Sequence, residues 1–163
     1  MADLSSTIAE GLAGYYGHVA AELHKWVDPL SEEEFWWNPF SHGNSVGHLV
    51  LHLTGNLNYY IGAQIAETRY VRDRDREFTE TQRRPMSEVM AAFDNTIAMV
   101  VETIRKQSAE NWMAAYSAKG EPDAKDRFTV LLRCAGHAYH HVGQIIYLNR
   151  ELTRKIGAKT TPV

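Results

Sequence analysis

The sequence holds few of the features that cross-link, anchor or export a protein. Its single cysteine, Cys134, excludes an intramolecular disulfide and is typical of a reducing compartment. No apolar run approaches the roughly 20 residues that a membrane-spanning helix needs. The first residues lack the basic and apolar regions of a signal peptide. We therefore expect a soluble, cytoplasmic protein.

Neither sign of charge dominates the chain. Lys and Arg number 17, Asp and Glu number 20, and the net charge is −3, with the basic residues spread along the sequence. This balance gives no reason to expect nucleic acid or an anionic membrane surface as a partner. A length of 163 residues fits one domain, residues 1–163, with a single core.

Apolar residues recur every three or four positions in four long segments, as expected of amphipathic helices. The segments run from Ile8 to Trp26, then over residues 44–67, 86–104 and 126–153. No alternating pattern predicts a sheet, so the fold class is all-α, most simply a four-helix bundle with long connections. The charged connection over residues 68–85 is expected to be solvated. Its length suggests that it packs over another part of the chain or over a partner subunit.

Two pairs of histidines stand out within these segments. His48 and His52 are four residues apart on the second predicted helix, and His137 and His141 have the same spacing on the fourth. Residues four apart lie on one helix face, so two imidazoles can reach one ion at about 2.0–2.1 Å. A third imidazole from a facing helix would complete a site with an open position. His18, His24 and His42 have no partner at this spacing, and we interpret them as structural.

The segments around these histidines resemble the DinB-like, or YfiT-like, family of metalloenzymes. The matching pieces are residues 44–56 and residues 137–145, where His–x₃–His is followed by Gly-Gln. The resemblance covers nearly the whole chain. It implies an up-down-down-up four-helix bundle, a homodimer, and a three-histidine site for zinc, nickel or a similar divalent metal. Carried over to this sequence, the metal ligands are His52, His137 and His141.

Neighbouring residues are candidates for supporting roles. His48 is expected to contact the ligands or the pocket, although its spacing leaves direct ligation open. Gln144 follows the second motif on the side of His141, with a plain surface role as the alternative. His140 points about 100° away from His141 around the helix and is expected to form hydrogen bonds or face solvent. Cys134 is expected in the core, with thiolate ligation as the alternative.

The residues beside the histidines constrain the chemistry. Leu49 follows His48 and Ala138 follows His137, so the glutamate of His-Glu-x-x-His is absent and a zinc-protease mechanism is not supported. A three-histidine metal with an open position lowers the pKa of bound water or deprotonates a bound thiol.

Because characterised relatives include thiol S-transferases, we hypothesise a metal-dependent enzyme that acts on a small molecule. Its co-substrate would be a low-molecular-weight thiol, and a hydrolase that uses water remains open. The alternative is a metal-binding or structural dimeric bundle of the stress-response type without catalytic activity.

Overall fold

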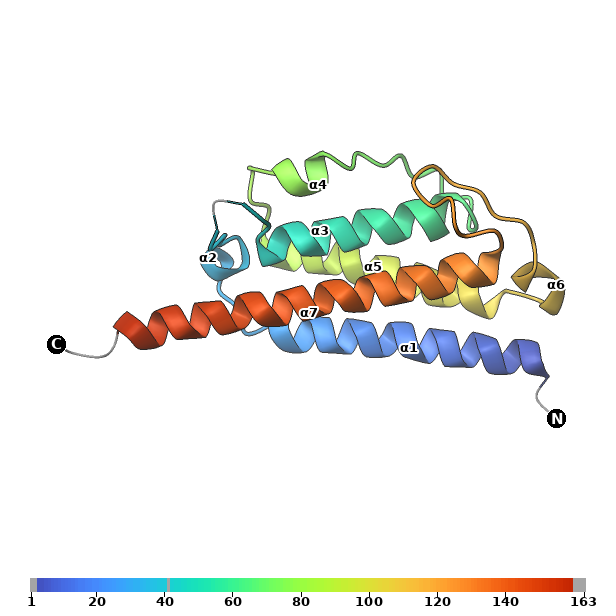
Figure 1. Ribbon diagram of the computed structural model, residues 1–163, viewed down its shortest axis with the longest axis horizontal. Helices are drawn as coiled ribbons and strands as arrows, with labels where there is room; N and C mark the ends of the chain where they lie inside the picture. Colours follow the sequence, from blue (N-terminus) through green and yellow to red (C-terminus); the bar gives the residue numbers. More distant parts are fainter. Residues whose placement is uncertain (1–2, 41, 160–163) are drawn as a thin grey trace.

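The computed structural model describes residues 3–40 and 42–159, and this part of the chain is all-helical. Four long helices lie side by side (Figure 1), and α1 and α3 each pack against both α5 and α7. In Figure 1, α1 and α7 run in one direction and α3 and α5 in the other. The four helices are α1 (Leu4–Val27), α3 (Val46–Leu57), α5 (Met86–Arg105) and α7 (Arg127–Lys159).

The long helices fall on the four segments with helical periodicity, which confirms the all-α prediction. The second segment does not stay α-helical to its end, because α3 passes into a π-helix, η1 (Asn58–Ala63). The last helix continues to Lys159, past the predicted end near residue 153. The described residues contain no β-strand, only an isolated bridge between Ala115 and Asp126. None of the described helices is long and apolar enough to cross a membrane.

Short helices connect the long ones, with α2 (Glu32–Phe35) and α6 (Ala109–Trp112) near the ends of the bundle and α4 (Arg76–Thr79) over α3 (Figure 1). Ser31 caps α2 in a capping box with Glu34. Phe35 and Trp36 are buried against the start of α3, where a Cβ added at Gly47 would lie 2.7 Å from the Trp36 ring. A glycine at this position therefore permits the close approach of the two helices.

The connection over residues 68–85, called the strap below, lies along α3 (Figure 1). Its expected solvation is wrong for part of its length, because Glu77 and Glu80 are 6% and 9% exposed. His48 of α3 anchors the strap by a hydrogen bond, in which its Nε2 donates to the Glu80 carbonyl oxygen at 3.0 Å. The strap therefore packs against α3, and its Glu77 and Glu80 side chains are buried there.

An ion pair between α1 and α5 makes the packing of these helices depend on pH. The His24 ring lies 2.7 Å from Asp94 and 2.9 Å from Asp28. Burial lowers the pKa of His24, but its hydrogen bonds to Asp94 and Asp28 outweigh this and raise it above 6.5. Stability contributed by a raised pKa is present below the unfolded value and is lost as the pH rises through the folded value.

We predict that His24→Gln lowers the free energy of unfolding most below pH 6.5, by up to about 1 kcal/mol because the pair is partly exposed. The difference from wild type should shrink as the pH rises above that value. Urea unfolding at several pH values measures it, and Asp94→Asn should give a smaller effect of the same sign. A difference that grows with pH would contradict this assignment.

Candidate metal centre

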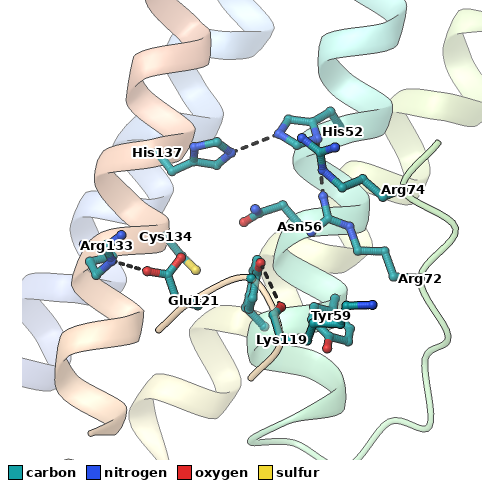
Figure 2. Close-up of a pocket in the computed structure, with 12 residues that line it drawn as sticks. His52, Asn56, Tyr59, Arg72, Arg74, Lys119, Glu121, Arg133, Cys134 and His137 are labelled. Carbon is teal, nitrogen blue, oxygen red and sulfur yellow. Dashed lines mark hydrogen bonds and ion pairs between the residues drawn. The ribbon is translucent and has the colours of Figure 1, made fainter. Parts of the chain in front are cut away.

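Three histidines from two helices converge at one point. His52 lies on α3, and His137 and His141 lie one turn apart on α7. One nitrogen from each lies within 4.8 Å of the other two, and the Nε2 atoms of His52 and His137 are 3.0 Å apart. In Figure 2, His52 and His137 point toward one another from their two helices. The structure therefore brings together the three histidines that the sequence analysis selected as ligands.

The hydrogen bonds of the outer nitrogens decide which atoms face the centre. His52 Nδ1 lies 2.8 Å from a Glu77 carboxylate oxygen, and His141 Nδ1 lies 2.6 Å from the Gln144 side-chain oxygen. Both partners are acceptors, so each Nδ1 carries a proton, and each Nε2 presents a lone pair in the neutral ring. His141 Nε2 is buried and has no hydrogen-bond partner in the described part of the chain. A buried unpaired nitrogen is costly unless something binds it.

Electrostatics keep two of these rings neutral. Burial, followed by the neighbouring His141 and His52 rings, lowers the pKa of His137 to about 4. Burial likewise lowers the pKa of His141 to about 4, although its bond to Gln144 acts in the opposite direction. Both rings are therefore uncharged near pH 7. Neutral imidazole is the form that binds a metal ion.

A buried ion pair from the strap supports His52. Arg72 grips the Glu77 carboxylate with two bonds, Nε to Oε1 at 2.6 Å and Nη2 to Oε2 at 2.8 Å. Burial raises the pKa of Glu77, but the bonds from Arg72 and His52 outweigh it, so the net shift is downward and the carboxylate is charged. The glutamate of a His-Glu-x-x-His motif is absent, as the sequence shows, and the carboxylate beside His52 comes instead from the strap. Glu77 adjoins His52 from the side away from the centre.

Gly55 makes room for this carboxylate. A Cβ added at Gly55 would overlap the Glu77 carboxylate, whereas one added at Gly136 or Gly143 of α7 meets open space. Gly55 directly precedes Asn56 and lies three residues after His52 on α3. Its missing side chain lets the strap approach α3 closely. The glycine is thus part of the centre, although it offers no ligand atom.

The other candidate residues take different places. Both His48 nitrogens are engaged at the start of α3, Nδ1 with Ser45 and Nε2 with the strap, so His48 lies outside the three-histidine group. Gln144 bonds His141 as described above. His140 is exposed, with its ring against His141. Cys134 is buried, and burial raises the pKa of its thiol to about 12, so it stays protonated and outside the group.

A cavity of about 770 Å³ opens beside the histidines (Figure 2). Its volume suits a small-molecule ligand. The walls come from α3, the π-helix, the strap, the start of α7 and the loop before α7. They are formed by His52, Asn56, Tyr59, Tyr60, Arg72, Arg74, Lys119, Gly120, Glu121, Arg133, Cys134 and His137.

Comparison with known families places this site in a family without an assigned function. A family model described as "Protein of unknown function (DUF1572)" matches residues 15–157, a span that holds all three histidines and the strap. The chain belongs to the DUF1572 family. A search of curated proteins gave no match. The family therefore supplies no activity, and the function must be argued from the site.

Three residues that build this site carry no recognisable signal in the sequence. Glu77 and Arg72 sit in a run of alternating charges that reads as solvated, and burial of an ion pair leaves no periodic pattern. Asn56 is 7% exposed and lines the cavity one turn after His52. The one signal that pointed to the strap was its length, which exceeds that of ordinary loops in compact domains.

We predict that Glu77→Gln weakens zinc binding about 10–100-fold, the usual effect of losing a hydrogen-bond partner of a metal-binding imidazole. It should also lower the free energy of unfolding by ~3 kcal/mol, because Arg72 stays buried without its counter-charge. Competition with a zinc chelator and urea unfolding measure the two effects. Unchanged zinc affinity in a folded variant would show that Glu77 does not orient His52.

Gly55→Ala tests the close approach with a change of one methyl group. The methyl displaces Glu77, so zinc affinity should fall as it does in Glu77→Gln. Gly14→Ala on α1 is the matched control, because a Cβ there meets open space. It should raise helix stability by up to ~1 kcal/mol and leave zinc affinity unchanged. Equal zinc affinity in the two variants would contradict the role of Gly55.

Proposed function

We propose that this protein is a metal-dependent enzyme of the DinB-like type that acts on a small molecule. His52, His137 and His141 would hold a divalent transition metal, with zinc or nickel expected. The most favoured reaction is transfer of a low-molecular-weight thiol, and hydrolysis by water is the second choice. The observation that carries the proposal is the convergence of the three histidines, with the outer nitrogens of His52 and His141 bonded to acceptors.

The residues present fit a metal of this kind. The buried Nε2 of His141 lacks a partner, and two rings are held neutral at pH 7. Imidazole nitrogens suit zinc, nickel, copper and iron, so the donor set fixes the class of ion and not its identity. Such an ion would supply Lewis acidity, which lowers the pKa of a thiol or water that reaches it.

The chain's own residues would prepare the reactants. Glu77 and Gln144 orient two imidazoles, and the strap and α7 form the walls that confine a substrate beside them. Cys134 keeps its proton and contributes apolar surface. The cavity next to the histidines favours an enzyme over a metal-binding or purely structural bundle, because a structural metal site is usually closed by protein ligands.

The bundle architecture, the oligomeric state and the cellular location are also part of the proposal. It takes the four long helices as an up-down-down-up four-helix bundle, which their packing and directions in Figure 1 support. A homodimer remains a prediction from the family resemblance. A cytoplasmic location rests on the single buried thiol, and the absence of nucleic-acid and membrane partners rests on the charge balance.

Metal content is the first test. We predict that the protein purified without chelators carries about one divalent metal per chain and that His137→Ala loses it while remaining folded. Cys134→Ala is the matched control on the same helix and should keep the metal. Elemental analysis and circular dichroism measure both properties. A wild type without stoichiometric metal would overturn the proposal, and loss of the fold in His137→Ala would favour a structural metal.

Activity is the second test, on the metal-loaded wild type. Small thiols paired with a panel of electrophiles should give turnover that His137→Ala abolishes. Leu132→Ala should retain it, because Leu132 is an exposed residue of α7 that does not line the cavity. Ester hydrolysis without thiol is the arm for the second choice. Stoichiometric metal without turnover in either arm would favour the non-catalytic alternative.

A further inference from the structure

The cavity beside the histidines is cationic, whereas the chain as a whole is not. Arg72, Arg74, Lys119 and Arg133 line it against the carboxylate of Glu121 alone, which gives formal charges of four positive and one negative. The whole sequence has a net charge of −3. The positive charge is therefore concentrated at this wall, where it raises the local concentration of anions.

Two of the four cations are already neutralised by partners. Arg72 forms an ion pair with Glu77, which also belongs to the strap. Arg133 of α7 forms an ion pair with Glu121 of the loop that precedes α7. Arg74 and Lys119 form no ion pair among the described residues. The Arg74 guanidinium instead lies 5.5 Å from the centre of the Phe78 ring, a contact that holds it at the strap side of the cavity.

The loop that carries Lys119 is held in place. Gly120 has a φ of +90° and lies so close to Tyr60 that a Cβ would be 2.7 Å from the tyrosine hydroxyl. The same hydroxyl is 3.4 Å from the Lys119 carbonyl oxygen, and Tyr116 donates to the Tyr60 carbonyl at 3.0 Å. Together with the Arg133–Glu121 pair, these contacts hold the backbone of the Lys119 loop at the edge of the cavity.

Asn56 adds an independent sign of a ligand. It is 7% exposed, it lines the cavity, and its side-chain oxygen is buried without a hydrogen-bond partner among the described residues. In Figure 2 its amide projects from α3 toward α7. Buried polar atoms are nearly always satisfied, so an acceptor left free in a cavity wall indicates a donor on the molecule that fills it. Asn56 lies one turn from His52, next to the metal centre.

We infer that this cavity binds a small anionic molecule that carries an N–H donor, with its carboxylate or phosphate between Arg74 and Lys119 and its N–H at Asn56. The inference rests on the proposed function, because it takes the cavity as the substrate site. It adds the charge and the donor that the substrate must have. The molecule's remaining end would lie toward His52 and His137, where the chemistry is proposed.

Three matched probes test this recognition without any reaction. N-acetylglycine has both the carboxylate and the N–H, N-acetylglycinamide lacks the charge, and N-acetylsarcosine lacks the donor. Nuclear magnetic resonance titration of the zinc-loaded and the metal-free protein gives each affinity and locates the shifted amides. N-acetylglycine should bind about tenfold tighter than either of the others, which corresponds to ~1.4 kcal/mol. N-acetylaminomethylphosphonate distinguishes phosphate from carboxylate as the preferred anion.

Variants assign the contacts. Arg74→Gln with Lys119→Gln should remove the preference for N-acetylglycine over the amide and leave zinc content unchanged. Lys106→Gln is the control, because Lys106 pairs with Glu102 on α5 and does not line the cavity. Asn56→Leu should remove the preference for N-acetylglycine over N-acetylsarcosine. It should leave the preference for N-acetylglycine over N-acetylglycinamide unchanged.

The outcomes separate this inference from the proposed function. Equal affinities for the three probes, or shifts confined to amides outside the cavity, would overturn the anion site even if the protein holds zinc and turns over substrate. Charge-selective binding that depends on Arg74 and Lys119 would support it even if no thiol-dependent activity were found.

Discussion

The contact between the Glu77 carboxylate and His52 is the constraint on which the site depends. A charged carboxylate that is 6% exposed must be fully bonded, and Arg72 and His52 supply those bonds. Its acceptor oxygen leaves His52 with only one tautomer, the one whose Nε2 lone pair faces His137. The space for the carboxylate exists because residue 55 is glycine. The glycine at position 55 of α3 and the carboxylate of Glu77 on the strap thus determine the orientation of the His52 imidazole.

The same contact joins the candidate metal centre to the cavity. Arg72 bonds Glu77 on one side, and its guanidinium lies 5.7 Å from the centre of the Tyr60 ring on the other. Any shift of the strap would therefore move the His52 support and the cavity wall together. The strap covers the face of α3 that carries His52 and Asn56. Without it, the long helices alone would leave these two side chains open to solvent on that face.

Periodicity and spacing predicted much of this arrangement, and they failed where burial follows no period. The four segments and the placement of His52, His137 and His141 follow from helical geometry and the family resemblance. Glu77 could not be found in this way. Its neighbours in sequence alternate in charge, as in a solvated loop, and its partner on α3 is 25 residues away. The role of His48 was also missed, because spacing cannot distinguish a ligand from a residue that caps α3.

The placement of the carboxylates bears on the type of reaction. Glu77 is held by Arg72 and His52, and its pKa is lowered, so it is a poor proton acceptor. Glu121 lines the cavity but is paired with Arg133. Among the described residues of the cavity wall, no other carboxylate is present to act as a base. The proposed reaction would therefore need a nucleophile that gives up its proton readily when it binds the metal. A thiol meets this requirement better than water, because its pKa starts several units lower.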